Sequence, residues 1–185
     1  MMKDQRSEEM MNDGQTEIYT LGHSNRNIEE FLEILKKKDI DIVIDVRLIP
    51  GSNKYPQYNK ENLEKYLNNN NIEYLHLKEL GGFRKPLKDS KNIWWRNKSF
   101  RGFADYIQRT EFKDVIKKLI EIAKNKKVVI ICSEKNPYRC HRRIISDYLS
   151  LIYNVKVIHI IDKNREEEHK VTKSTKIINN DIIYQ

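Results

Sequence analysis

The chain has 185 residues, of which 38% are hydrophobic and 34% are charged, and its formal net charge is +8. Ten tyrosines, five phenylalanines and two tryptophans supply enough apolar surface for one packed core, which excludes a disordered protein and indicates a single domain. No apolar stretch is long enough to span a membrane, and the start, "MMKDQRSEEMMNDGQ", lacks the apolar region of a signal peptide. We therefore expect a cytoplasmic protein without a membrane partner and with reduced thiols.

The first half of the chain alternates apolar runs with helical patterns. "IYTLG" (18–22) predicts a short strand that ends at a glycine, and "NIEEFLEILKKK" (27–38) predicts a helix capped by its first residue. "IDIVIDVR" (40–47) is a nearly continuous β-branched run, which is typical of a strand buried on both faces. A helix at 59–70 and a strand at 72–77 follow.

The second half repeats the alternation after a long segment without periodicity. Residues 78–103 carry paired glycines and a proline and predict a functional or mobile loop. Helical spacing then predicts a helix at 110–125 and another at 140–152, and apolar runs predict strands at 127–132 and 155–161.

The domain organisation follows from where these patterns begin and end. Residues 1–17 are acidic and aperiodic, which favours a mobile N-terminal leader, and residues 18–162 contain all the predicted elements. Residues 163–185 form a weakly patterned C-terminal tail, either a flexible end or a short edge strand. The expected fold class is α/β: one domain with a mostly parallel sheet of about five strands and helices on both faces.

Polar and reactive residues follow four of the predicted strands. These strands lead into "GHSNR" (22–26), "DVR" (45–47), "LKELGG" (77–82) and "CSEKNPYRCHRR" (132–143). In a parallel sheet the carboxyl ends of the strands meet at one edge, where ligands bind. The sequence therefore predicts a functional site at this edge.

The same segments carry a resemblance to a known family. "TLGHSNRNIEEFLEILKKKDIDIVIDVRLIP", "IEYLHLKELGGFRKP" and "CSEKNPYRCHRRIISDYL" resemble the domain-of-unknown-function family 488, from about residue 18 to 162. The resemblance implies a compact cytosolic α/β domain, but no biochemical role is established for the family. Its segment after "DVR" is often richer in arginine than "LIPGSNKYPQYN" is here, which weakens a phosphate role for that loop. The positions that match the family pattern are His23, Ser24, Asp45, Arg47, Gly81, Gly82, Cys132, Glu134, Cys140, His141 and Arg142.

Thiol catalysis is one chemistry that this edge can support. Cys140 lies near the predicted start of a helix among arginines, and both features stabilise a thiolate. Adjacent helical residues do not face each other, so we expect His23 rather than His141 to act as the base. The alternative is that Cys140 is a small buried residue. The spacing from Cys132 to Arg139 is one residue too long for a cysteine phosphatase.

Metal binding and anion recognition are the other two chemistries. Cys132, Glu134, Cys140, His141 and His23 include ligand types suited to zinc, but no paired spacing supports a metal site, so none is assigned and the cofactor stays unknown. Instead of binding a metal, Glu134 can form an ion pair with an arginine of the site. Asp45 can likewise form a structural ion pair with Arg47 or Arg142 instead of acting in catalysis.

The charge of the chain has two interpretations. Clustered arginines at a helix start favour a phosphate ligand, whereas the many lysines, as in "KKK" (36–38), also fit a compositional bias of the genome. The 78–103 loop interleaves aromatic and cationic side chains, which suits either base stacking or a hydrophobic lid.

We therefore expect a protein that binds or acts on a phosphate-bearing ligand, a nucleotide or nucleic acid. The alternatives are a non-catalytic nucleic-acid-binding module and a metal- or thiol-dependent enzyme on a small molecule. The sequence leaves open whether the protein is an enzyme, and its oligomeric state. The candidate catalytic residues are His23, Asp45, Glu134 and Cys140. The candidate ligand-binding residues are Ser24, Arg26, Arg47, Gly81, Gly82, Arg84, Trp94, Trp95, Arg101, Cys132, Arg139, His141 and Arg142.

Overall fold

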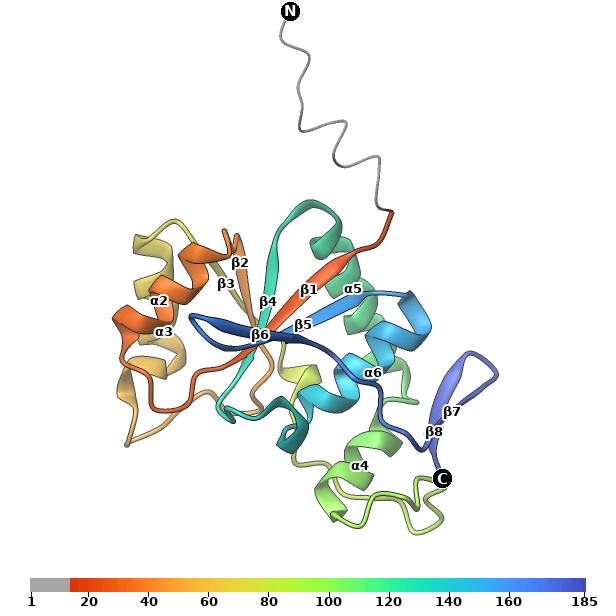
Figure 1. Ribbon diagram of the computed structural model, residues 1–185. Coiled ribbons are helices and arrows are strands. Elements are labelled where there is room, and N and C mark those ends of the chain that lie inside the picture. Colours follow the sequence, from red (N-terminus) through yellow and green to blue (C-terminus); the bar gives the residue numbers. More distant parts are fainter. Residues whose placement is uncertain (1–13) are drawn as a thin grey trace, which may run out of the picture.

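A six-stranded sheet forms the centre of the protein, in a computed structural model that describes residues 14–185 (Figure 1). The strand order is β3-β2-β4-β1-β5-β6, and every neighbouring pair is parallel except β5 and β6. The strands are β1 (Glu17–Gly22), β2 (Ile42–Asp45), β3 (Glu73–His76), β4 (Val128–Cys132), β5 (Lys156–Asp162) and β6 (Arg165–Glu168). The prediction of a single α/β domain with a mostly parallel sheet is confirmed, with one strand more than expected.

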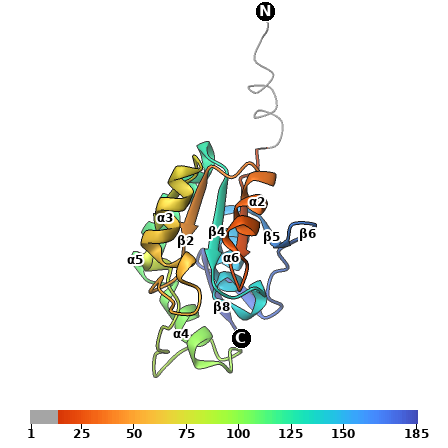
Figure 2. The same ribbon diagram turned by 90° about the vertical axis from the view of Figure 1, so that its left-hand side faces the viewer.

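Helices cover both faces of the sheet. On one face lie α2 (Ile28–Lys37) and α3 (Lys60–Asn69), which face the viewer in Figure 2. On the other lie α4 (Lys98–Tyr106), α5 (Thr110–Asn125) and α6 (Arg142–Tyr153) (Figure 1). Each face has its own apolar core, because alternate side chains of the central strands point to opposite sides.

Local capping accounts for the start of α2. The side chain of Asn27 accepts a hydrogen bond from the backbone N–H of Glu30 at 2.8 Å, as its sequence position predicts. At α3 the cap position is Asn59, but its side chain accepts from the backbone N–H of Ser52 at 2.6 Å instead. This bond fixes the loop between β2 and α3, so that Asn59 serves the loop rather than the helix.

The segment predicted as one long loop contains a helix. α4 occupies the end of the 78–103 segment, and its first free N–H groups donate to the side chain of Asn97. The helical pattern is interrupted by Gly102, where a Cβ would lie 1.9 Å from the carbonyl oxygen of Arg84. Only glycine allows the loop to pass this close to the helix, which is why helix propensity alone does not indicate α4.

The sequence predicted an N-terminal leader and a weakly patterned C-terminal tail, and the structure describes all of the second but little of the first. Residues 1–13 of the proposed leader lie outside the described residues, and β1 begins at Glu17. In the tail, β6 pairs with β5, and β7 (Thr175–Ile178) and β8 (Asp181–Tyr184) form a hairpin. The tail also contributes Ile182 and Tyr184, both fully buried, to the core that contains α4 and α6. Within residues 14–185, no helix is both long enough and apolar enough to cross a membrane.

Gly22 provides a test of how closely the loops at the sheet edge pack. A Cβ at this position would lie 1.9 Å from the carbonyl oxygen of Glu134, so Gly22→Ala must displace backbone. We expect the free energy of unfolding in urea to fall by about 1–3 kcal/mol, the usual cost of overpacking. Gly51→Ala is the matched control, because nothing lies within 4 Å of the position that a Cβ would occupy there. Equal stability of the two variants would contradict this packing.

Candidate functional site

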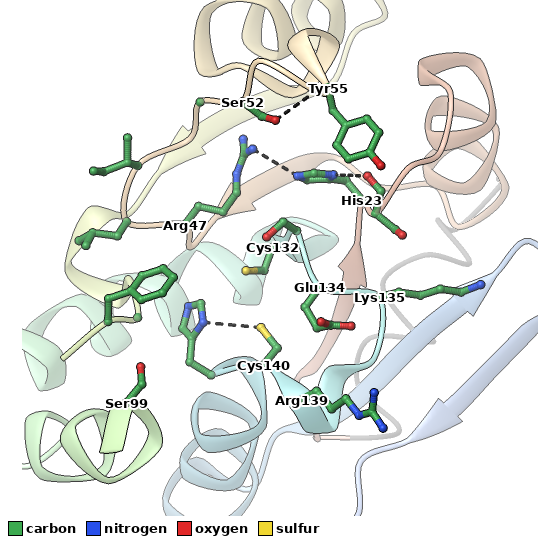
Figure 3. A pocket seen from close by; sticks show the side chains of 18 of the residues that line it. His23, Arg47, Ser52, Tyr55, Ser99, Cys132, Glu134, Lys135, Arg139 and Cys140 are labelled. Carbon is green, nitrogen blue, oxygen red and sulfur yellow. Dashed lines mark hydrogen bonds between the residues drawn. The ribbon is translucent and has the colours of Figure 1, made fainter. Parts of the chain in front are cut away.

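A cavity of about 840 Å³ lies at the carboxyl ends of the central strands (Figure 3). β1 and β4 are neighbours, yet the chain continues from β1 to α2 on one face and from β4 to α6 on the other. Loops that diverge from adjacent parallel strands leave a crevice between them, which is where ligands bind in such sheets. The cavity occupies this crevice, at the edge that the sequence predicted.

The structure brings together about half of the candidate residues around this cavity. Those that line it are His23, Ser24, Arg47, Gly82, Cys132, Glu134, Arg139, Cys140 and His141. Those that do not are Arg26, Asp45, Gly81, Arg84, Trp94, Trp95, Arg101 and Arg142. Several lining residues escaped the sequence analysis because they come from irregular loops, among them Ile49, Lys54 and Asn97.

Cys132, Cys140 and His141 form one cluster at the cavity wall. Cys132 ends β4, and Cys140 follows a short 3-10 helix, Pro137–Arg139. The backbone changes from extended at Cys140, with φ −129° and ψ 152°, to helical at His141, with φ −60° and ψ −14°, and at this bend the two side chains lie close together. The Cys140 Sγ is 3.6 Å from the His141 Nδ1, and the ligating atoms of all three side chains lie within 4.8 Å of one another. The expectation that His141 faces away from Cys140 was wrong, because it assumed a helical backbone at Cys140.

Neighbouring groups fix the orientation of the His141 ring. Its Nε2 lies 2.9 Å from the carbonyl oxygen of Val46. A carbonyl only accepts, so Nε2 carries the proton and, in the neutral ring, Nδ1 presents a lone pair toward Cys140. A Cβ at Gly82 would lie 3.2 Å from this Nδ1, so a glycine here keeps the nitrogen accessible. His141 can therefore accept a proton from Cys140 or coordinate a metal through Nδ1.

Arg142 lies behind this cluster rather than in the cavity. Its side chain is 1% exposed, and its Nε and backbone N–H each approach the Cys140 Sγ at 3.5 Å. Its Nη1 donates to the Thr20 hydroxyl at 3.1 Å and its Nη2 to the carbonyl of Glu134. Among the described residues no carboxylate pairs with it, so the negative charge closest to this buried cation is the one that Cys140 can carry.

The two thiols have opposite environments. Burial raises the pKa of Cys140, but the hydrogen bond from Cys132 and the charge and hydrogen bonds of Arg142 outweigh it and lower this pKa. The hydrogen bond to Cys140, together with burial, raises the pKa of Cys132. Of the two thiols, Cys140 is therefore the one whose surroundings favour the thiolate.

Asp45 and Arg47 form a buried ion pair at the opposite wall of the cavity. The Arg47 Nε and Nη2 donate to the two Asp45 oxygens at 2.9 and 2.6 Å, and the Tyr74 hydroxyl donates to Oδ2 at 2.6 Å. The structural ion pair considered as the alternative role of Asp45 is thus present. Asp45 is fully buried and does not line the cavity.

His23 is held against this ion pair. Its Nε2 faces the Arg47 Nη1 at 3.3 Å (Figure 3), and its Nδ1 lies 2.8 Å from the carbonyl of Ser24. Its ring stacks on Tyr58 at 4.1 Å. An arginine only donates, so Nε2 accepts and Nδ1 carries the proton. Burial, aided by the charge of Arg47, lowers the pKa of His23 to about 4. Its lone pair is occupied by Arg47, whereas that of His141 faces a thiol.

The remaining candidates are engaged elsewhere. Glu134 uses its carboxylate to accept from the backbone N–H of Asn136 at 3.0 Å, and it has no arginine partner among the described residues. Arg26 bonds carbonyl groups of Gly22 and Ile161, Arg84 lies over the ring of Tyr106, and Arg101 donates to the carbonyl of Trp95. Gly81 packs against Leu48.

The two tryptophans belong to a packed aromatic layer. Trp95 is buried, stacks on Phe100 at 5.1 Å, and lies 5.0 Å from the guanidinium of Arg143. Trp94 contacts Trp95 edge-on at 4.8 Å. Of the two roles considered for the 78–103 loop, the packing of Trp95 fits the hydrophobic lid.

A buried hydrogen-bonded chain, which the sequence did not indicate, leads away from Arg142. Thr20 contacts the Nδ1 of His159 at 2.6 Å, the Nε2 of His159 contacts the Nδ1 of His169 at 2.8 Å, and the Nε2 of His169 contacts Asp147 at 2.7 Å. Each donor has an acceptor if the protons run from Arg142 toward Asp147, with both histidines neutral. The chain thus holds the Thr20 oxygen as an acceptor for Arg142.

Burial of two histidines predicts a pH-dependent stability. Burial, aided by the charges of His169 and Arg142, lowers the pKa of His159 to about 3, and that of His23 is about 4. Below about pH 6.5 both histidines bind protons in the unfolded chain but not in the folded chain. The free energy of unfolding therefore decreases as the pH is lowered. Between pH 7 and 5, urea unfolding should show a loss of about 2 kcal/mol for each histidine. The variant His159→Gln should lose about 2 kcal/mol less over the same interval; an unchanged pH dependence would contradict the burial of a neutral ring.

The Asp45–Arg47 pair makes a second prediction. Asp45→Asn leaves the buried guanidinium without its counter-ion, and we expect the free energy of unfolding to fall by about 3–5 kcal/mol. Glu121→Gln, which removes an exposed ion pair with Lys124, is the control and should leave stability nearly unchanged. If both variants unfold at the same urea concentration, the pair is not structural.

Comparison with known proteins identifies the family. Neither a curated protein nor a solved structure matches the chain. A family model described as "Domain of unknown function DUF488" matches residues 27–149, well over half of the chain. The matched segment extends from the cap of α2 into α6 and includes the cluster of Cys132, Cys140 and His141. The chain therefore belongs to the domain-of-unknown-function family DUF488, as the sequence motifs predicted.

Proposed function

We propose that the cavity binds a small molecule that carries a phosphate group, and that the cluster of Cys132, Cys140 and His141 acts on it. The observation that carries this proposal is the position of Arg139. Its side chain is exposed, lines the cavity, and has no hydrogen-bond or ion-pair partner among residues 14–185. A guanidinium at the wall of a cavity favours a phosphate or carboxylate because of its paired donors.

The electrostatics of the cavity support an anionic ligand. The first turn of α6 contains no acidic residue and begins with Arg142 and Arg143, although the positive end of a helix dipole disfavours cations. Among the residues that line the cavity, Glu134 is the only carboxylate, whereas Lys54, Lys135 and Arg139 are cationic. An anion bound near the start of α6 would relieve this excess of positive charge.

The shape of the rim supports an organic group attached to that anion. Phe83 lines the cavity, is 85% exposed, and has a φ of 60°. Bulky residues rarely adopt this left-handed conformation, which costs on the order of 1–3 kcal/mol and tends to occur at ligand sites. Ile49, 80% exposed, lies on the same rim. Exposed apolar side chains beside a cationic wall suit a flat ring such as a nucleotide base.

The size of the site favours a nucleotide over a nucleic-acid strand. A volume of about 840 Å³ falls in the range of small-molecule pockets, roughly 300–1,000 Å³. Proteins that bind single strands usually stack successive bases on exposed aromatic rings. Here Trp95 is buried in the aromatic layer, which leaves Phe83 as the exposed aromatic ring among the residues that line the cavity.

Calorimetric titration of the full chain with AMP, inorganic phosphate and adenosine tests this proposal. We expect Arg139→Ala to weaken AMP binding about tenfold to a hundredfold, because a charge-assisted bond is lost. Phe83→Ala should weaken AMP binding but leave phosphate binding unchanged. Arg165→Ala, at an exposed arginine on β6, is the control and should bind like the wild type.

Two outcomes would contradict the proposal. One is equal affinity for AMP and adenosine, which would mean that no phosphate is recognised. The other is AMP binding that Arg139→Ala leaves unchanged. Single-stranded DNA that binds much more tightly than AMP, with a steep dependence on salt, would favour the nucleic-acid module instead.

A further inference from the structure

We propose that Cys132, Cys140 and His141 form a three-ligand site for a zinc-like divalent metal ion, with its fourth position open to the cavity. Their ligating atoms lie within 4.8 Å of one another, and all three residues line the cavity. Two thiolates and one imidazole, plus one open position, make up the ligand set of a catalytic rather than a structural zinc site. The inference goes beyond the proposed function, because it concerns a metal ion bound by the cluster itself and not the phosphate-bearing ligand in the cavity.

The distance between adjacent ligands fits tetrahedral coordination. Zinc–sulfur bonds of about 2.3 Å and zinc–nitrogen bonds of about 2.0–2.1 Å at a tetrahedral angle place the two ligand atoms about 3.6 Å apart. The Cys140 Sγ and the His141 Nδ1 are 3.6 Å apart. The change from an extended backbone at Cys140 to a helical one at His141 is what brings two consecutive side chains together.

The surroundings of the ligands are those of a metal site. Ligating histidines usually donate their second ring N–H to a carbonyl or carboxylate, which fixes the coordinating nitrogen. The Nε2 of His141 does this to the carbonyl of Val46 at 2.9 Å. The Cys140 sulfur accepts two N–H groups of Arg142 at 3.5 Å, and Gly82 leaves space beside Nδ1. Two thiolates also balance the charge of a divalent ion.

Two other uses of the thiols fit less well. A redox pair of Cys132 and Cys140 would give no role to the oriented lone pair of His141. A hard ion such as Mg²⁺ would require oxygen ligands. The carboxylate of Glu134 accepts from the backbone N–H of Asn136 instead and is not part of the cluster. Soft sulfur ligands with an imidazole select zinc and its chemical relatives.

Cobalt titration of the reduced, chelator-treated full chain tests the site, because four-coordinate Co²⁺ bound by thiolates absorbs strongly in the visible and near ultraviolet. We expect each chain to bind one Co²⁺, with an absorption band in the visible and another in the near ultraviolet. One equivalent of Zn²⁺ should displace the Co²⁺ and abolish both bands. Cys132→Ser, Cys140→Ser and His141→Asn should each lower the affinity about 100-fold or more, since even indirect partners of a metal contribute 10- to 100-fold. His76→Asn is the histidine control and should bind Co²⁺ like the wild type.

Two further measurements distinguish the metal site from the phosphate site proposed above. Arg139→Ala should lose AMP affinity and retain full Co²⁺ affinity, so the failure of either proposal is seen independently. If a ligand variant is unfolded by circular dichroism, the wild type still decides: one equivalent of Zn²⁺ should slow the reaction of both thiols with a disulfide reagent at least tenfold. Thiol reactivity unchanged by Zn²⁺, or Co²⁺ bands that persist at full affinity in Cys140→Ser or His141→Asn, would overturn the inference.

Discussion

The site depends on a buried cation that has no carboxylate partner among the described residues, the guanidinium of Arg142. Removing an arginine from water costs several kcal/mol, so its donors must find partners inside the protein. They reach the sulfur of Cys140, the hydroxyl of Thr20 on β1 and the carbonyl of Glu134 in the loop after β4. Because these groups come from a strand, a loop and the segment before α6, the same contacts that satisfy the charge also fix where the thiol lies. Stability and chemistry are therefore coupled at this residue.

The topology of the sheet explains why such a centre can face a cavity. The chain leaves β1 and β4 toward opposite faces, so their loops separate above adjacent strands and leave a crevice. Gly22 and Gly82 let backbone and ring approach closely at the base of this crevice, where a side chain would collide or crowd. One wall carries the Cys140 cluster and the other carries Arg47 with His23, each tied to buried partners. The side chains of both walls are mostly buried, whereas the rim carries the exposed Phe83, Lys54 and Arg139.

Sequence patterns predict the sheet and its active edge because both arise from local regularities. Buried parallel strands are β-branched runs, and strand ends are marked by reactive residues such as those after Cys132. What the sequence did not reveal depends on contacts between distant segments. His159 and His169 meet Thr20 and Asp147 only in the folded chain, and α4 tolerates Gly102 only because the Arg84 loop lies against it. His141 was misjudged because the helix begins only after Cys140, and the change from extended to helical backbone at this point brings the two side chains together.

The buried chain from Arg142 to Asp147 connects the site to residues near both ends of the described part of the protein. The family model matches residues 27–149, and Thr20, His159 and His169 all lie outside the matched segment. Tyr184, almost at the end of the chain, donates to Asp147 at 2.8 Å and completes the same chain of contacts. The Thr20 hydroxyl that accepts from Arg142 is thus held by residues from the two flanks of the domain. Substitutions in these flanks can shift the Cys140 thiol, although Thr20, His159, His169 and Tyr184 do not line the cavity.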